Sequence, residues 1–577
     1  MTDTTGPSTV AYFSMEICLE QAIPTYSGGL GVLAGDTLRS AADLQVPLVA
    51  VTLLHRRGYF QQSIDAQGNQ SEQPVSWRPE DRLEEMPARV VVAIEGRDVT
   101  IRAWRYRVIG RTGHEVPVYL LDSSVDGNSD WDRTLTDCLY GGDLHYRLCQ
   151  EVILGIGGAA MLRALGHEPI VAYHMNEGHA ALVTVPLLEW QLDGRQVFEV
   201  EDADLEAVRR RTIFTTHTPV PAGHDKFPLD MVRAVIGDKR VELLEKAKCT
   251  DEGTLNMTHI ALRLSRFVNG VAMKHREVSQ GMFPTYPINS ITNGVHAATW
   301  TSPRFQALFD ESMPEWRADN LYLRYAVGIE LAAIREAHTE CKKEFLDEVA
   351  KRTGVTLDVN AFTLGFARRA TPYKRADLVF SDVERLVRIT EHVGPLQVVF
   401  GGKAHPHDDG GKELIRRIHE ASRTLGDRVK VVYIENYEME IAAKMVAGVD
   451  LWLNNPMKPL EASGTSGMKA ALNGVPSLSV LDGWWIEGHV EGVTGWSIGS
   501  AVDPEGDQSK DAFDLYMKLE RVIMPLYYGL PYAYAEVMRH AIALNGSFFN
   551  TQRMVEQYVR NAYFPNSVVT VAEAVTA

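Results

Sequence analysis

The sequence predicts an α/β protein with two doubly wound domains that face each other across a cleft. Short apolar runs alternate with helical stretches through most of the chain, which is typical of largely parallel sheets. A chain of 577 residues is also too long for one compact core. Residues 301–353 are helical and charged and carry no strand-like run, so they separate two sets of strands. In such folds, ligands bind at the carboxyl ends of the strands.

Both halves of the chain contain apolar runs of strand length. In the first half, strands are expected at Val46–His55, Pro169–His174 and Arg211–Thr216, with helices at Leu33–Leu44 and His179–Leu192. The second half is more regular. Its five expected strands are Ala361–Ala367, Leu396–Phe400, Val429–Ile434, Leu451–Asn454 and Ser477–Leu481.

A turn-rich segment, Asn293–Pro303, predicts the boundary between the two domains. The first domain would span residues 1–298, and the second would span residues 299–577. Helices are expected over Asp511–Tyr563, and the last of them could pack back on the first domain. The final dozen or so residues are expected to be loosely ordered.

The composition argues against several classes of protein. A net charge of −17 argues against binding to nucleic acid or to an anionic membrane. The five cysteines are scattered without a metal-binding or redox spacing, which predicts a reduced, cytoplasmic protein without a metal site. No apolar run reaches the roughly 18 residues of a membrane span. An acidic protein that binds phosphate must concentrate positive charge locally, so a basic cluster is informative.

Such a cluster follows the predicted strand that ends at Ala367. Residues 368–375, RRATPYKR, place four cations at the carboxyl end of that strand, where ligand sites of α/β proteins form. A charge run is usually only a solvated surface. Its position within an acidic chain favours a phosphate site instead.

Two glycine-containing turns are candidates for holding phosphate. Ser27–Gly31 (SGGLG) precedes a predicted helix, whose N-terminus offers N–H groups to an anion, although such a turn is as often only structural. Residues 461–469, EASGTSGMK, combine a turn at Gly464–Gly467 with Lys469 on the next helix. A lysine beside a phosphate-binding turn suits a Schiff-base cofactor. By pattern alone, a capped helix with a surface lysine is the commoner explanation.

Polar residues at three further strand ends or turns could face the cleft. They are Asn176–His179, Thr216–Thr218 and Thr292–Gly294. Together they would supply the neutral donors and acceptors that the hydroxyl groups of a sugar need. A single histidine at such a position is more often a satisfied structural residue.

Taken together, these segments resemble the glycogen and starch phosphorylases, glycosyltransferases with the two-domain GT-B fold. EASGTSGMK resembles the family's lysine motif for pyridoxal 5′-phosphate (PLP), and RRATPYKR resembles its phosphate-binding segment. Matches in the same order, including AYFSMEI, GGKAHP and IENYEM, extend from about Ala11 to Asp482. The resemblance covers most of the chain and implies an α-glucan phosphorylase.

The resemblance also implies a role for each matching residue. Lys469 would bind PLP and Arg368 would hold the cofactor's phosphate. The catalytic set would add Arg369 and Lys374, on the substrate phosphate, and His217. The remaining implied contacts are Gly29, Gly464, Thr465, Ser466 and Tyr437 for the cofactor, and Gly29, Leu30, His217, Asn293, Tyr373, Glu461, Ser463, Gly464 and His179 for the sugar.

The chain departs from the family pattern in three ways. Ser466 and Gly467 stand where the family usually has Gly-Asn. The match begins at Ala11, so the N-terminal extension that carries phosphorylation and nucleotide control in longer members is expected to be absent. The stretch between SGGLG and THTP is also shorter, so the loop that gates the active site is expected to be missing or rebuilt. The resemblance leaves open the preferred glucan and whether the chain forms a homodimer.

The implied reaction is a reversible, retaining phosphorolysis of an α-glucan by inorganic phosphate. The cofactor's phosphate group would exchange a proton with the substrate phosphate, since a phosphate ester ionises near pH ~6. Two rivals stay open: a GT-B transferase that uses a sugar nucleotide, as glycogen synthase does, and a catalytically silent glucan-binding protein. Lys469 argues against the first, which needs no Schiff-base lysine. The joint presence of Lys469, Arg369, Lys374 and His217 argues against the second.

Overall fold

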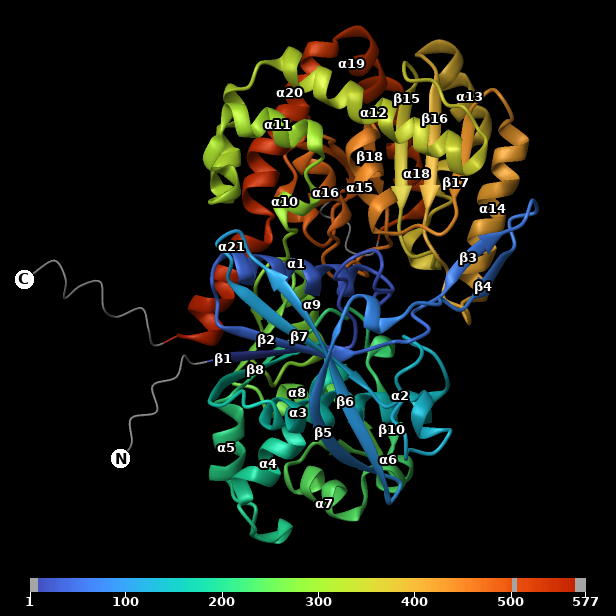
Figure 1. Ribbon diagram of the computed structural model, residues 1–577. Coiled ribbons are helices and arrows are strands. Elements are labelled where there is room, and N and C mark those ends of the chain that lie inside the picture. Colours follow the sequence, from blue (N-terminus) through green and yellow to red (C-terminus); the bar gives the residue numbers. More distant parts are fainter. Residues whose placement is uncertain (1–8, 501–505, 566–577) are drawn as a thin grey trace, which may run out of the picture.

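The computed structural model describes residues 9–500 and 506–565, which form two α/β domains (Figure 1). In the first domain, a nine-stranded sheet has the order β14-β13-β9-β8-β1-β2-β7-β6-β5. Its strands are β1 (Thr9–Ser14), β2 (Leu48–Leu53), β5 (Glu84–Ile94), β6 (Arg97–Ile109), β7 (Glu115–Asp122), β8 (Ile170–Asn176), β9 (Thr212–Thr215), β13 (Phe267–Gly270) and β14 (Asn289–Ser290). The strands from β14 to β7 pair in parallel, whereas β5, β6 and β7 form an antiparallel edge.

The second domain is built on a six-stranded sheet in the order β17-β16-β15-β18-β19-β20. Its strands are β15 (Phe362–Ala367), β16 (Leu396–Gly401), β17 (Lys430–Ile434), β18 (Leu451–Asn454), β19 (Ser477–Val480) and β20 (Gly495–Ile498). Every pair in this sheet is parallel. A parallel sheet needs cover on both faces, which explains why its strands are apolar throughout rather than alternating.

Helices cover the two faces of each sheet. Those of the first domain are α1 (Gly29–Asp43), α2 (Leu144–Val152), α3 (Gly158–Ala164), α4 (Thr184–Leu192), α5 (Asp202–Arg209), α6 (Leu229–Ile236), α7 (Asp238–Lys246), α8 (Met257–Arg263) and α9 (Met273–Met282). Along β1, Ala11 and Phe13 join a core with α2 and α3, while Val10 and Tyr12 join another with α1. Successive side chains of a strand point to opposite faces, so both faces of this sheet are buried.

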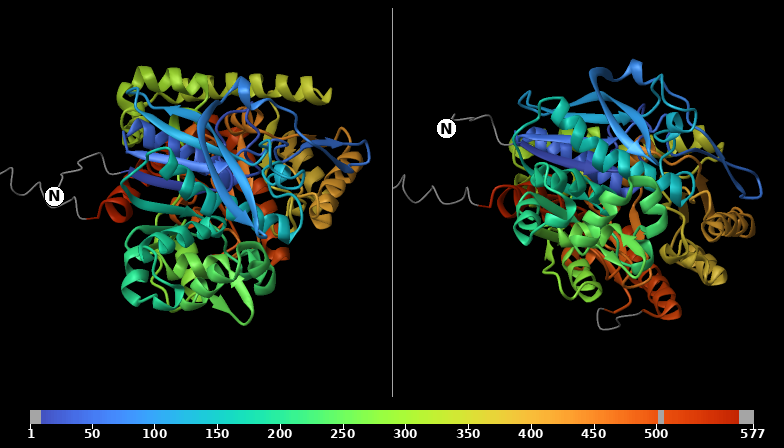
Figure 2. Two further views of the ribbon diagram at one scale, coloured as in Figure 1. Left: turned by 60° about the horizontal axis from the view of Figure 1, so that its bottom comes forward. Right: turned by 90° about the horizontal axis from the view of Figure 1, so that it is seen from below.

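The remaining helices belong to the second half of the chain. They are α10 (Ala297–Trp300), α11 (Pro303–Ser312), α12 (Leu331–Thr353), α13 (Val383–His392), α14 (Asp409–Leu425), α15 (Met439–Gly448), α16 (Ser466–Leu472), α17 (Trp485–Gly488), α18 (Gln508–Lys518), α19 (Met524–Gly529), α20 (Pro531–His540) and α21 (Thr551–Tyr558). The long α12 runs along the outside of the second domain (Figure 2). None of the helices in the described ranges combines the length and apolar character needed to cross a membrane.

Two segments cross from one domain to the other. Helix α21 follows the second domain in sequence but packs with α1 in a core of the first. Its Tyr558 hydroxyl bonds to Thr215 Oγ1 and Asn269 Nδ2, both at 3.0 Å. In the opposite direction, the hairpin of β3 (Gln61–Ile64) and β4 (Gln70–Gln73) reaches from the first domain to α14 (Figure 1). Helix α21 and the β3–β4 hairpin therefore connect the two domains at opposite ends of their interface.

The α/β fold with two facing domains agrees with the sequence-based expectation, and each expected strand is present within a few residues. The stretch 301–353 carries no strand, as expected. The antiparallel edge β5–β6–β7 and the strand β20 were not anticipated. The expected helix at His179–Leu192 begins as a 3₁₀ helix, Gly178–Val183, before α4. The expected boundary at residue 298 falls inside α10, and the expected loose end, 566–577, lies outside the described residues.

The Tyr558 contacts predict how strongly α21 is held. Tyr558 is buried, so Tyr558→Phe leaves two buried polar partners with one hydrogen bond fewer. We expect a loss of about 1–2 kcal/mol and a fall in melting temperature of roughly 1–4 °C, measured by differential scanning fluorimetry. The control is Tyr325→Phe, at a side chain that is 58% exposed. Equal melting temperatures for the two variants would contradict the docking role.

Candidate active site

A pocket of about 710 Å³ lies between the two domains and is lined by segments of both. Loops that follow β1, β9, β13 and β14 contribute from the first sheet, and loops that follow β15, β16, β17 and β18 contribute from the second. Its lining contains five basic side chains, Arg368, Arg369, Lys374, Lys403 and Lys469, and three acidic ones, Glu20, Glu438 and Glu461. In a chain with a net charge of −17, this is a local excess of positive charge.

The Glu461 carboxylate holds two of these cations together. Its Oε2 lies 2.8 Å from Arg368 Nη1 and also pairs with Lys374 Nζ. Burial alone would raise the pKa of Glu461, but the two cations outweigh it and lower the pKa to about 2. The carboxylate is therefore ionised at every physiological pH. A phosphate that enters the pocket meets cations that are already positioned.

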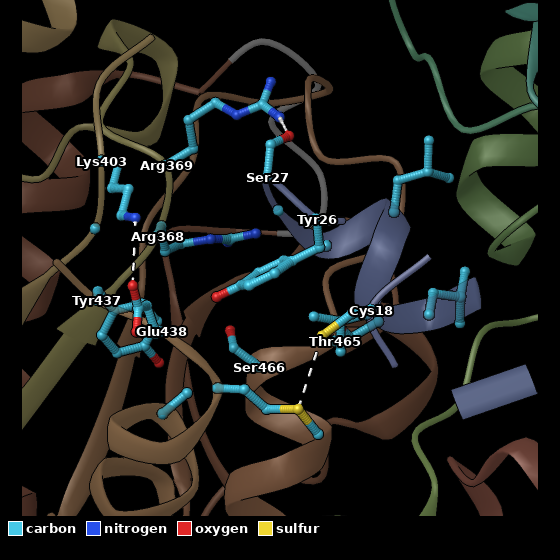
Figure 3. Close-up of a pocket in the computed structure, with 18 of the residues that line it drawn as sticks. Cys18, Tyr26, Ser27, Arg368, Arg369, Lys403, Tyr437, Glu438, Thr465 and Ser466 are labelled. Carbon is cyan, nitrogen blue, oxygen red and sulfur yellow. Dashed lines mark hydrogen bonds and ion pairs between the residues drawn. The ribbon is translucent and has the colours of Figure 1, made fainter. Parts of the chain in front are cut away.

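Arg369 lies over the glycine loop of the first domain. Its Nη2 approaches Ser27 Oγ at 3.5 Å, and Figure 3 shows the side chain turned toward that residue. The loop is shaped by a buried carboxylate, Glu16, whose Oε2 accepts from Ser27 N at 2.6 Å. A Cβ at Gly31 would lie 2.8 Å from the same oxygen, so only glycine fits there. The loop and the basic segment thus meet although they belong to different domains.

Lys469 is buried on the second-domain side of the pocket. It is the fourth residue of α16, and its side chain is 8% exposed. Its Nζ lies 3.7 Å from the centroid of the Trp300 ring, and within the described chain it has no ion pair with an acid. Burial lowers the pKa of the amine to about 8, and Asp36 partly opposes this shift. About one tenth of such an amine is neutral, and therefore nucleophilic, at pH 7, far more than for an ordinary lysine.

The two residues that depart from the family pattern, Ser466 and Gly467, lie at the start of α16. Ser466 Oγ accepts from Trp452 Nε1 at 3.0 Å, which anchors the start of the helix. A Cβ at Gly467 would lie 2.8 Å from the Trp484 ring, so the helix packs here because the residue is glycine. Thr465 precedes the helix without a side-chain cap. The substituted motif therefore still presents a turn followed by a buried lysine.

His217 lies on the first-domain side of the pocket, and its tautomer follows from its neighbours. Ser14 Oγ donates to the Glu16 carbonyl, so it accepts from Asn176 Nδ2. Asn176 Oδ1 must then accept from His217 Nε2, at 2.7 Å. Burial lowers the pKa of His217 to about 4, so the ring is neutral and Nδ1 is its acceptor. An acceptor of this kind suits a sugar hydroxyl group.

Asn293 and His179 differ in their surroundings. Asn293 lines the pocket, and its buried Oδ1 has no hydrogen-bond partner among the described residues, as a sugar contact requires. His179 does not line the pocket: its Nε2 faces Asp225 at 3.3 Å. His179 is the second residue of the 3₁₀ helix Gly178–Val183, which follows β8.

The structure brings together all of the predicted site residues except His179. Those that line the pocket are Gly29, Leu30, His217, Asn293, Arg368, Arg369, Tyr373, Lys374, Tyr437, Glu461, Ser463, Gly464, Thr465, Ser466 and Lys469. Sequence reasoning missed Tyr26, which lies across the pocket in Figure 3, and the pair Lys403 and Glu438. The motifs GGKAHP and IENYEM contain that pair, so the segments had been noticed without these two side chains.

Comparisons with known proteins identify the family of this chain. A model of the carbohydrate phosphorylases matches residues 236–492. Maltodextrin phosphorylase of Thermococcus litoralis is 42% identical over 96% of this chain and 70% of its own length. Glycogen phosphorylase of Aquifex aeolicus is 34% identical over 96% of this chain and 86% of its own length. Glycogen phosphorylase of Mycobacterium tuberculosis is 36% identical over 97% of this chain and 71% of its own length.

Fold and comparisons together place the protein among the glycosyltransferases of the GT-B fold. Within that class, the chain belongs to the carbohydrate phosphorylase family. Dependence on PLP is characteristic of this family.

The bridging position of Glu461 predicts the response of the pocket to anions. Because Glu461 competes for Arg368 and Lys374, Glu461→Gln should bind inorganic phosphate about 3–10-fold more tightly at low salt. Isothermal titration calorimetry of the purified protein measures this affinity. The exposed Glu420, changed to Gln, is the matched control. Weaker phosphate binding by Glu461→Gln would mean that the carboxylate organises the cations more than it competes for them.

Proposed function

We propose that this protein is an α-glucan phosphorylase. It would transfer the terminal α-1,4-linked glucose of a glucan to inorganic phosphate, giving α-D-glucose 1-phosphate and a shortened glucan. The observation that carries the proposal is the convergence of Arg368, Arg369 and Lys374 on a pocket that also holds the buried amine of Lys469. The names of the relatives, maltodextrin and glycogen phosphorylase, support the same substrate class.

The residues present fit PLP. Lys469 offers an amine with a pKa of about 8 that no acid pairs with in the described chain. Arg368 is a cation on the same pocket wall, suited to a phosphate ester. Tyr437 and Tyr26 supply aromatic surface nearby (Figure 3). When bound, the cofactor would supply a phosphate group that acts as an acid and a base near neutral pH.

Arg369 and Lys374 would bind the substrate phosphate. Their charges lower the cost of bringing a second phosphate beside one held by Arg368. Held there, the substrate phosphate can protonate the glycosidic oxygen and then attack the anomeric carbon from the same face, which retains the configuration. No pair of carboxylates is required, in contrast to a glycoside hydrolase.

The sugar would be held by neutral groups and one carboxylate. His217 Nδ1 and Asn293 Oδ1 are acceptors for hydroxyl groups, and Glu461 lies across from them on the second domain. Ser463 and Gly464 line the same pocket. Because these contacts come from both domains, a glucose unit would bind only where the domains meet.

We also propose that the protein works in a reducing compartment, the cytoplasm. All five cysteines are free thiols, and four of them are buried. Burial raises the pKa of Cys18 to about 12, so this thiol beside the pocket is not a reactive thiolate.

The position of the cofactor is tested by reduction with borohydride followed by peptide mass spectrometry. We expect a pyridoxyl-phosphate adduct on Lys469 and none on Lys403. Lys403 is the internal control, because it lines the same pocket and burial also lowers its pKa to about 8. Lys469→Ala should abolish both the adduct and phosphorolysis. An adduct only on Lys403, or none after incubation with PLP, would favour a sugar-nucleotide transferase or a silent glucan-binding protein.

The role of Arg369 is tested by steady-state kinetics. Loss of a charge-assisted contact of about 1.5–3 kcal/mol predicts a 10- to 100-fold increase in KM for phosphate in Arg369→Ala, with a lower kcat. Arg388→Ala, at an exposed position of α13 in the same domain, should leave both parameters unchanged. If KM for the glucan rose and KM for phosphate did not, Arg369 would belong to the sugar site.

A further inference from the structure

The amine of Lys469 rests on the face of a tryptophan. Lys469 Nζ lies 3.7 Å from the ring centroid of Trp300, whose side chain is 1% exposed. Tryptophan is the ring that attracts a cation most strongly, and burial strengthens the attraction because little water competes. A lysine side chain has four rotatable bonds, so a surface that holds its end removes most of that freedom.

The tryptophan is itself held by a carboxylate from the first domain. Trp300 Nε1 donates to Asp36 Oδ2 at 2.7 Å, and Asp36 has no exposed surface. The same carboxylate accepts from His296 N at 3.1 Å and from Arg39 Nη1 at 3.2 Å. From the second domain, Asn473 Nδ2 donates to the Trp300 carbonyl at 2.8 Å. The first domain therefore holds the indole N–H of Trp300, and the second domain holds the backbone of the same residue.

We propose that Asp36 and Trp300 are positioning residues for Lys469, Asp36 by fixing the indole through its N–H and Trp300 by fixing the amine on its face. The amine would then be placed for a carbonyl group entering the pocket before any cofactor is present. This inference rests on the proposed function, in which Lys469 carries PLP.

The charged groups around the Lys469 amine give Asp36 a second effect on this lysine. The ionisable groups that act on it are Asp36 and Arg39 of α1 and the thiol of Cys18. Burial lowers the pKa of Lys469, and Asp36 is the largest influence in the opposite direction. Asp36 therefore has two effects on Lys469: it orients the ring beneath the amine, and it limits the fall in the pKa of that amine. The two effects can be separated by mutation.

The test uses the full chain without PLP, labelled with [ε-¹³C]lysine and observed by NMR. Lys469→Arg identifies the Lys469 signal. Protons held over an aromatic face are shielded, so the Lys469 Hε signals should lie upfield of those of the other lysines. Titration should show an amine pKa near 8. A Lys469 signal among those of exposed lysines would overturn the proposal.

Three variants separate the parts of the arrangement. Trp300→Leu should abolish the upfield shift, and Trp300→Phe, which keeps a ring but loses the N–H, should reduce it. Asp36→Asn keeps an acceptor for the indole, so the shift should stay while the pKa of Lys469 falls further. The matched control is Asp43→Asn. Asp43 lies on the same helix and bonds to His296 Nε2 at 3.0 Å, but it does not touch Trp300 Nε1.

PLP uptake gives a second readout, measured as the rate of adduct formation on Lys469. Trp300→Leu should slow uptake by about 5- to 30-fold, and Asp43→Asn should not change it. If the wild type takes up PLP and every variant matches it in rate and spectrum, the positioning role fails while the proposed function stands. If the wild type takes up no PLP on Lys469, the proposed function fails, and the NMR shifts still report on the geometry. Should Trp300→Leu not fold, Trp300→Phe and Asp36→Asn decide the question.

Discussion

The site depends on one buried carboxylate that holds two cations side by side. Arg368 and Lys374 lie within six residues of each other after β15, and without a counter-ion their burial would be costly. Glu461 pairs with both, at a sequence separation of 87 residues from Lys374. The protein can thus keep a cationic pocket formed inside an otherwise acidic chain before any anion arrives. The pairing also ties the segment after β15 to the segment that leads into α16.

The pocket exists only because the two domains are docked. The glycine loop, Glu16 and His217 come from the first domain, while the basic segment and Lys469 come from the second. Helix α21 and the hairpin β3–β4 each carry contacts across the boundary, in opposite directions along the chain. Contacts between the domains also occur close to the pocket, where Arg369 Nη2 lies 3.5 Å from Ser27 Oγ.

Sequence reasoning predicted what depends on local pattern. The apolar runs predicted the strands of both sheets. Because ligands bind at the carboxyl ends of parallel strands, Arg368 and Lys374 were expected at the cleft, where they lie. Sequence reasoning could not identify Asp36 as the hydrogen-bond partner of Trp300, because 264 residues separate them and neither lies in a distinctive motif. The edge strand β5 was missed because its first half carries Glu84, Glu85 and Arg89 and is interrupted by Pro87, and a proline within a run argues against a strand. Nothing in the sequence indicated that His179 faces Asp225, 46 residues away, and does not line the pocket.

Two lysines of the pocket have similar pKa values, so pKa alone does not identify the lysine that would carry PLP in the proposed function. Burial lowers the pKa of both Lys403 and Lys469 to about 8, so both amines are partly neutral near pH 7. Lys403, however, donates to the Phe60 carbonyl at 2.8 Å and faces Glu438 at 3.8 Å. The nearby carboxylate of Glu438 favours the protonated form of the Lys403 amine, which has no free lone pair. Both amines lie over an aromatic ring, Lys403 at 5.3 Å from the Phe60 centroid and Lys469 at 3.7 Å from the Trp300 centroid, but Lys469 has no carboxylate or carbonyl partner among the described residues. We therefore expect the neighbours of each amine, more than its basicity, to favour Lys469 over Lys403 as the PLP lysine of the proposed function.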